Sequence, residues 1–128
     1  MGGSTLGTEA IYFFLNNKVR KKINFLNNLD NFKKINNKKS CNIIVSKSGN
    51  TLEVATNVNL FVKKNDKNLI ITENKNNILR AMANKLKSDV IDHKNYIGGR
   101  YSVLSEVGMI PAELMGLNEK KFKRLNYL

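Results

Sequence analysis

The sequence predicts an α/β protein, a doubly wound αβα sandwich built on a mostly parallel sheet. Short apolar segments alternate with longer amphipathic ones, as repeated strand–helix units do. The predicted strands are continuously apolar, which is typical of strands buried on both faces of a parallel sheet. Segments rich in glycine, serine and threonine lie next to these elements. Since ligands bind at the carboxyl ends of such strands, we expect a functional site at that edge of the sheet.

The first 40 residues predict a loop and three further elements. A loop at 2–4 precedes a helix at 6–21, and a short strand at 23–26 precedes a short helix that Asp30 caps. The first helix is expected because three residues share one apolar stripe that would face the core: Leu6, Ala10 and Phe14.

The rest of the chain has a clearer pattern. Strands are predicted at 41–45, 69–72 and 89–92, and helices at 52–62, 78–86 and 101–109. Pro111 suits the first turn of a further helix, where no N–H donor is needed. With 128 residues the chain has the length of one domain, to which we assign residues 1–117. Residues 118–128 then begin a following helical segment.

Composition excludes several classes of protein. The net charge is +12, but 18 lysines accompany only 4 arginines, and 21 asparagines suggest AT-rich codons instead of selection for phosphate contacts. A diffuse basic surface of this kind steers anionic metabolites and does not favour nucleic acid as the main partner. Cys41 is the single cysteine, so neither an internal disulfide nor a zinc cluster is expected. No apolar run or basic leader predicts a membrane or secreted protein, so we expect a cytoplasmic one.

The first motif is Gly2-Gly3-Ser4-Thr5-Leu6-Gly7, at the start of the first predicted helix. Glycines let a ligand approach the backbone, and the hydroxyl groups can bind an anion. A tight turn followed by a helix cap is an equally good interpretation.

The second motif is Ser46-Lys47-Ser48-Gly49-Asn50-Thr51, between a predicted strand and a predicted helix. Its polar side chains and free N–H groups converge at a helix start, where the helix dipole favours negative charge. It lacks the Gly-Lys-Ser/Thr ending of a nucleotide P-loop, so a monophosphate cradle fits it better. The alternative is a polar turn in which Asn50 or Thr51 caps the helix.

The third motif is Gly98-Gly99-Arg100-Tyr101-Ser102. Paired glycines before an arginine at a helix start would direct a permanent cation across the strand ends, and the guanidinium group suits anionic oxygens. The alternative is a surface arginine after a turn.

These segments, in this order, resemble the glucose-6-phosphate isomerase (phosphoglucose isomerase) family, and more narrowly its first sugar-isomerase (SIS) domain, which is flavodoxin-like. The matching stretches are MGGSTLGTEA at 1–10, VSKSGNTLEV at 45–54 and GGRYSVLSEVGMIPAELMGL at 98–117. The SxSGxT pattern is shared by many SIS proteins, whereas GGRYSVLSEVG is close to a family signature. Because the family's chains are several times longer, we interpret this chain as a middle slice that lacks the first strand of the sheet.

The resemblance implies a homodimeric cytoplasmic enzyme that interconverts glucose 6-phosphate and fructose 6-phosphate through a cis-enediol(ate), without metal or organic cofactor. It implies that Arg100 stabilises the negative charge of the intermediate, where a fixed cation acts mainly on the transition state. It implies that Gly3, Ser4 and Gly99 line the substrate site. It assigns the substrate phosphate to four residues: Ser46, Lys47 through its backbone, Ser48 and Thr51.

The chain also departs from the family's pattern. The family's proton-transferring glutamate, its ring-opening histidine and a further lysine lie downstream, and neither Glu106 nor Glu113 matches that glutamate's motif. His93, the single histidine, is expected to be a surface or edge residue. Asn50 stands where relatives often have threonine, which phosphate binding should tolerate. We expect the isolated chain to be inactive, and marginally stable because the missing strand leaves backbone groups unpaired.

Three functions are compatible with these observations. The first is a part of a glucose-6-phosphate isomerase that supplies the phosphate loop and the arginine. The second is a non-catalytic SIS module that binds or senses a sugar phosphate. The third, a nucleic-acid-binding domain, would show a steeply salt-dependent affinity for DNA.

Overall fold

The computed structural model describes residues 4–27 and 41–122, and the chain divides into two compact units. Unit 1 contains residues 26–96, and unit 2 contains residues 3–25 and 97–128. The helix expected after Asp30 lies outside the described residues. No helix in the described ranges is long and apolar enough to cross a membrane.

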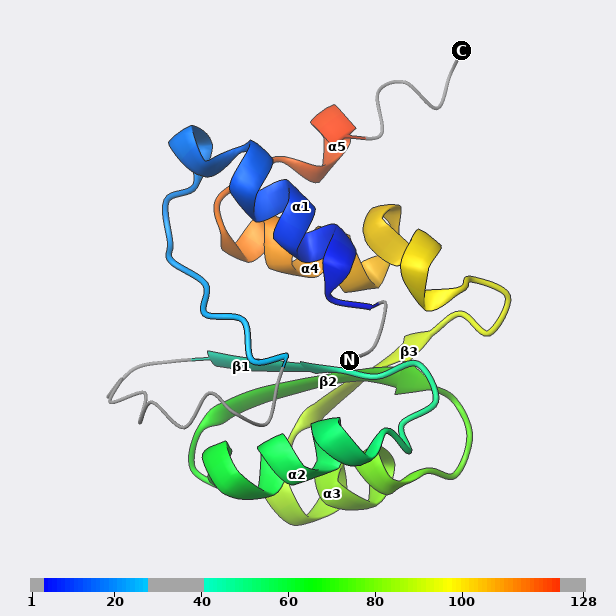
Figure 1. Cartoon of the computed structure of the whole chain (residues 1–128). Coiled ribbons are helices and arrows are strands. Elements are labelled where there is room, and N and C mark those ends of the chain that lie inside the picture. Colours follow the sequence, from blue (N-terminus) through cyan, green and yellow to red (C-terminus); the bar gives the residue numbers. More distant parts are fainter. Residues whose placement is uncertain (1–3, 28–40, 123–128) are drawn as a thin grey trace. The chain divides into compact units, whose positions relative to one another are not determined.

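Unit 1 is a three-stranded parallel sheet with two helices (Figure 1). Its elements are β1 (Cys41–Val45), α2 (Leu52–Phe61), β2 (Lys67–Glu73), α3 (Ile78–Leu86) and β3 (Asp89–His93). The strand order β1-β2-β3 and the parallel pairing confirm the α/β class and all three strands predicted between residues 41 and 92. Both predicted helices are also present, with α2 one residue shorter than expected.

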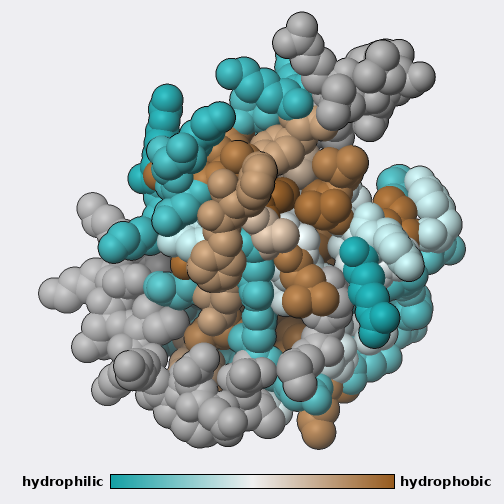
Figure 2. All heavy atoms as spheres, turned by 45° about the horizontal axis from the view of Figure 1, so that its top comes forward, coloured by the Kyte–Doolittle hydropathy of each residue, from teal (hydrophilic) through white to brown (hydrophobic). Residues whose placement is uncertain are grey.

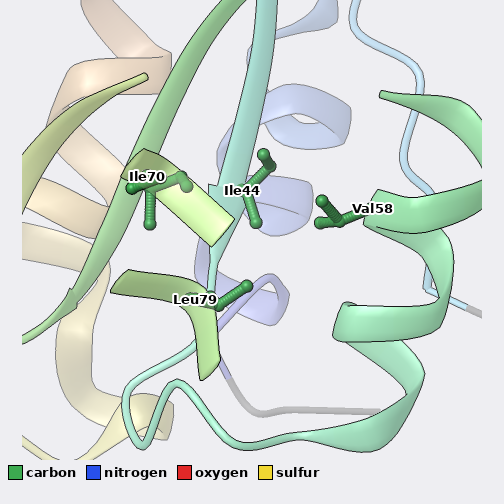
Figure 3. Packing of buried hydrophobic residues seen from close by; sticks show 5 residues of the cluster. Ile44, Val58, Ile70 and Leu79 are labelled. Atoms are coloured by element: carbon green, nitrogen blue, oxygen red, sulfur yellow. The ribbon is translucent and has the colours of Figure 1, made fainter. Parts of the chain in front are cut away.

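The core of unit 1 lies between the sheet and its two helices. Ile44 pairs with Ile70 across β1 and β2, and both side chains point towards Val58 of α2 and Leu79 of α3 (Figure 3). Each such side chain contributes about 1.5–3 kcal/mol when it is withdrawn from water. Since α2 follows β1, α3 follows β2 and these strands are parallel, both helices begin at the edge of the sheet where β1 and β2 end.

Unit 2 is helical and is assembled from the two flanking parts of the chain. Its elements are α1 (Leu6–Phe14), η1 (Asn16–Lys18), η2 (Gly99–Leu104), α4 (Glu106–Leu114) and α5 (Glu119–Phe122). The buried side chain of Ile11 in α1 packs on three apolar residues in α4 or at its C-cap: Met109, Ala112 and Met115.

The predicted helix at 6–21 was wrong in its length and in its buried face. The α-helix ends at Phe14, and the 3₁₀ turn η1 contains Asn16 and Asn17, which are weak helix formers. Leu6 and Phe14 are 57% and 85% exposed, and Ala10 is exposed as well, so this stripe does not face the core. The buried residues are Thr8 and Ile11. Apolar side chains are also seen at the surface in Figure 2.

Residues 23–26 do not form the expected strand. Ile23 is the one β-branched residue of this segment, and four residues with a single such side chain do not specify a strand. Ile23 instead packs, partly buried, against the core of unit 2.

The predicted helix at 101–109 is divided at Ser105. This residue is extended, with φ −93° and ψ −173°, and its side chain accepts a hydrogen bond from the N–H of Val107, so α4 begins there. Pro111 lies in the interior of α4 and not in a first turn. Proline cannot donate to the Val107 carbonyl four residues earlier. Thr8 of α1 donates its hydroxyl to that oxygen at 3.1 Å, which explains how the proline is tolerated.

Candidate functional site

The segment Ser46–Thr51 is a compact turn between β1 and α2. The buried Ser46 hydroxyl lies 2.9 Å from the Thr51 hydroxyl and accepts the N–H of Gly49 at 3.2 Å. The Ser48 hydroxyl, which is exposed, accepts the N–H of Asn50 at 3.3 Å. The turn therefore holds three hydroxyl groups at the carboxyl end of β1.

Helix α2 begins without a side-chain cap. Thr51 occupies the N-cap position in an extended conformation, but its hydroxyl is directed to Ser46 and makes no cap hydrogen bond. Asn50 does not cap α2 either, because its amide oxygen accepts the N–H of Ile78 in α3 at 3.0 Å. The alternative in which Asn50 or Thr51 caps this helix was therefore wrong. The first N–H groups of α2 stay available to an acceptor from outside the helix.

The turn is docked on the β2–α3 connection. The N–H of Leu79 donates to the Gly49 carbonyl at 3.0 Å, and the carbonyl of Lys47 accepts from the N–H of Glu73 at 3.0 Å and from the Thr72 hydroxyl at 3.3 Å. These bonds connect the turn to a neighbouring strand and helix, so its conformation does not depend on its own residues alone.

Sequence reasoning missed the residues on the β2–α3 side of this arrangement. Asn77 caps α3, and its position directly before the clearest apolar stripe was a usable signal for a cap. Thr72 and Glu73 are polar residues at the end of an apolar strand, which places them at the ligand-binding edge of a parallel sheet. Their hydrogen bonds with the turn are tertiary contacts, which no local pattern predicts.

Glu73 is the charged centre of this edge. Its carboxylate lies 3.5 Å from the Lys47 ammonium and forms a second, closer ion pair with Lys75. The hydrogen bond from Lys75 lowers the pKa of Glu73, partial desolvation opposes that shift, and the positive charges of Lys75 and Lys47 add to it. Lys47 also donates to the Asn95 carbonyl at 2.8 Å. Its side chain is thus engaged away from the hydroxyl groups of the turn.

The other predicted site residues lie in unit 2. Ser4, which is 6% exposed, precedes α1, and Gly99 and Arg100 open η2. The Arg100 side chain is exposed, while the Ser102 hydroxyl beside it donates to the Gly99 carbonyl at 2.6 Å. Gly3 lies outside the described residues. The four predicted phosphate-binding residues are therefore gathered in one turn of unit 1, and Ser4, Gly99 and Arg100 belong to unit 2.

We expected His93 to be a surface or edge residue, and it lies on β3, an edge strand of the three-stranded sheet, but it is not at the surface. It ends β3, beside Glu73 in the register of the sheet, and it is only 3% exposed. The sequence around His93 did not indicate this burial. Among the described residues, no group of three or more His, Cys, Asp or Glu side chains could hold a metal ion.

Comparison with known proteins gives consistent matches. A family model described as phosphoglucose isomerase matches residues 1–125. The chain is 34% identical to a glucose-6-phosphate isomerase of Mycoplasma genitalium, over 94% of this chain and 32% of that protein. A glucose-6-phosphate isomerase of Methanocaldococcus jannaschii is 33% identical, over 94% of this chain and 33% of that protein.

A solved structure agrees with these sequence matches. The crystal structure of a hypothetical protein from Thermus thermophilus has a TM-score of 0.80 and 25% identity, and the match covers 93% of this chain and 32% of that chain. This similarity supports the αβα fold class that the alternation of strands and helices predicts. The chain spans about a third of the length of the curated relatives that it matches.

Proposed function

The chain belongs to the phosphoglucose isomerase family, and from this membership we propose that it supplies the phosphate-binding part of a glucose-6-phosphate isomerase. The proposed reaction interconverts glucose 6-phosphate and fructose 6-phosphate through a cis-enediol(ate), a step of glycolysis and gluconeogenesis. The enzyme acts in the cytoplasm as a homodimer. The proposed base and acid belong to a part of the enzyme that this chain does not contain.

The observation that carries the proposal is the uncapped start of α2 beside three hydroxyl groups. A helix N-terminus without a cap presents N–H groups and a partial positive charge, and both favour an anion. Hydroxyl groups can add short hydrogen bonds to a phosphate oxygen. The residues that we assign to the phosphate are Ser46, Ser48, Thr51 and the backbone of Lys47.

Arg100 has a different role in the proposal. Its guanidinium group is exposed at the start of η2, between a glycine pair and a buried serine. We assign it to the negative charge that develops on the intermediate, because a permanent cation with several fixed donors suits such an oxyanion. Ser4, Gly3 and Gly99 complete the proposed lining of the substrate site.

A calorimetric titration of the 128-residue chain with glucose 6-phosphate tests the phosphate site. The double variant Ser48→Ala/Thr51→Ala should bind about 10–100-fold more weakly, because two hydroxyl groups no longer donate to a charged ligand. Thr56→Ala is the control. The Thr56 hydroxyl lies in α2 but donates to the Leu52 carbonyl, so this variant should bind like the unmodified chain. Equal affinities for the double variant and the control would refute the assignment.

Arg100 is tested in a full-length isomerase that contains this chain. Arg100→Ala should lower kcat much more than it raises KM, because the proposed contact forms mainly in the transition state. Equal effects on both parameters would contradict this role. Binding of glucose 6-phosphate without turnover in every longer form of the protein would instead favour a non-catalytic sugar-phosphate sensor.

A further inference from the structure

Asn77 lies between the phosphate turn and the start of α3. Its side-chain oxygen accepts the N–H of Arg80 at 2.9 Å, which caps the helix. Its amide nitrogen points the other way and donates to the Thr72 hydroxyl at 3.1 Å and towards the Glu73 carbonyl at 3.4 Å. One side chain thus serves a helix cap and a second set of contacts that a cap does not need.

These second contacts lead to the phosphate turn. The Thr72 hydroxyl, which receives the Asn77 amide, itself donates to the carbonyl of Lys47. A relay of two hydrogen bonds therefore connects Asn77 with the second residue of the turn. Since Thr72 is 0% exposed, water does not compete for this relay, and a partner lost there leaves a buried polar group unpaired.

Asn77 also fits against Gly49, the fourth residue of the turn. Gly49 has φ +68°, and a Cβ atom built on it would lie 2.2 Å from the Asn77 Cγ atom. The amide group of Asn77 therefore occupies the place that a side chain at position 49 would take. The hydrogen bond from the Leu79 N–H to the Gly49 carbonyl holds the two segments at this distance.

We propose that Asn77 is a positioning residue for the phosphate turn, which it holds in its binding conformation before the ligand arrives. This inference deepens the proposed function and rests on it, and it assigns Asn77 no contact with the sugar phosphate. Asn77 fixes the turn at two points, through Thr72 to Lys47 and by packing on Gly49. A turn that is already ordered loses less conformational freedom on binding, and its affinity is correspondingly higher.

A role as a helix cap alone is the competing explanation, and two variants separate it. Asn77→Ser and Asn77→Asp both keep an oxygen that can accept the Arg80 N–H, so α3 stays capped. Both remove the amide donor to Thr72, and the serine is too short to pack on Gly49 as the amide does. Asn76→Ala is the matched control. Asn76 is exposed in the β2–α3 connection, next to Asn77, and makes no side-chain hydrogen bond within the described part of the chain.

The first measurement is the affinity of the full 128-residue chain for glucose 6-phosphate, together with the Tm of each variant. Asn77→Ser and Asn77→Asp should bind about fivefold more weakly, the loss expected for one hydrogen bond. Their Tm should fall less than that of Asn77→Ala, because they lose the partner of Thr72 but keep the cap of α3. Asn76→Ala should match the unmodified chain in both. Unchanged affinity in both Asn77 variants would overturn the proposal, and so would a loss of affinity that simply follows a loss of Tm.

Native-state hydrogen exchange gives a second measurement that needs no ligand. The N–H groups of Gly49 and Asn50 are bonded inside the turn, so their exchange reports its order. They should exchange faster in Asn77→Ser and at the original rate in Asn76→Ala; unchanged exchange in Asn77→Ser would overturn the proposal. If the unmodified chain bound no sugar phosphate, the proposed function would fail, whereas this exchange would still decide whether Asn77 positions the turn.

Discussion

Helices α2 and α3 begin at the same edge of one sheet, yet their first turns are completed in opposite ways. The N–H groups of Ile78, Leu79 and Arg80 at the start of α3 all find acceptors within unit 1, in Asn50, Gly49 and Asn77. The start of α2 has no side-chain cap. Two helix starts at one edge of the sheet therefore differ in whether other residues of the protein satisfy their first N–H groups.

The difference depends on how a few polar side chains are directed. Asn77 is turned inward over its own helix, whereas Thr51 turns its hydroxyl to Ser46 and away from α2. An absent cap costs about 0.5–2 kcal/mol of stability. The comparison indicates that α2 bears this cost at the proposed binding site, and that α3 serves as the fixed support beside it.

The largest effect is expected when the contact between Gly49 and Asn77 is disrupted. Gly49→Ala places a methyl group at positive φ and against the Asn77 side chain, and we expect it to lower the free energy of unfolding by about 2–4 kcal/mol. Urea denaturation measures the change. Gly116→Ala is the control, because Gly116 also has positive φ (+88°) but the atoms nearest to its Cβ would belong to the Arg20 side chain, the first at 3.0 Å. An equal cost in both variants would show that the Asn77 contact is not decisive.

The second variant gives α2 a side-chain cap, so that its first N–H groups find an acceptor within the protein. Thr51→Asp supplies a strong cap and a negative charge, so it should raise stability by about 0.5–1 kcal/mol and weaken glucose 6-phosphate binding about tenfold or more. Thermal unfolding and calorimetry measure the two changes. Thr51→Asn adds a cap without the charge and should lose less affinity. If Thr51→Asp kept its affinity, the anion would not lie at the start of α2.

A further effect on stability is expected when α3 loses its cap. Asn77→Ala should lower the free energy of unfolding by about 1–2 kcal/mol, since Arg80 and Thr72 both lose a partner. Asn76→Ala should leave it unchanged. An equal stability loss in both variants would mean that the β2–α3 connection is sensitive to any substitution. The cap by Asn77 would then not explain how the start of α3 differs from that of α2.

The sequence was informative wherever burial alone decides structure. The strands of unit 1 and helix α3 follow from continuous apolar runs and one clean stripe, and the hydroxyl-rich turn was found because it lies between two such elements. The stripe of Leu6, Ala10 and Phe14 was misleading because an alternative face, with Thr8 and Ile11, is the one that packs.

The remaining misses depend on contacts between distant residues. Pro111 is tolerated inside α4 because Thr8 supplies a donor to Val107, and no pattern near residue 111 contains that information. The role of Asn77 beyond its own helix follows from its position over Gly49. The predicted roles of Ser46, Ser48, Thr51 and Arg100 came from resemblance, and they stay predictions until binding and turnover are measured.

The smallest effect is expected from the charge of Glu73 at the end of β2. The pKa of Glu73 is lowered in the folded protein, so its ion pairs with Lys75 and Lys47 stabilise the fold above the ordinary pKa of glutamate, and this contribution is lost as the pH falls through the lowered value.

Urea denaturation of the unmodified chain and of Glu73→Gln tests this sign. The gap in stability between them should be present at about pH 7 and should narrow as the pH falls below the ordinary pKa of glutamate and through the lowered pKa of Glu73. A gap that did not change with pH would mean that packing, and not charge, explains the effect of position 73.

The bond between Thr8 and Val107 has a consequence for how the protein is made. Its partners are 99 residues apart, so a ribosome that adds roughly 5–20 residues per second needs roughly 5–20 s to supply the second after the first. Unit 1 is continuous over residues 26–96 and can fold within that interval. The apolar side of α1, with Ile11, meanwhile waits for Met109 and Met115. During synthesis the Ile11 side chain of this short helix therefore stays without its core partners until residues 109–115 have been added.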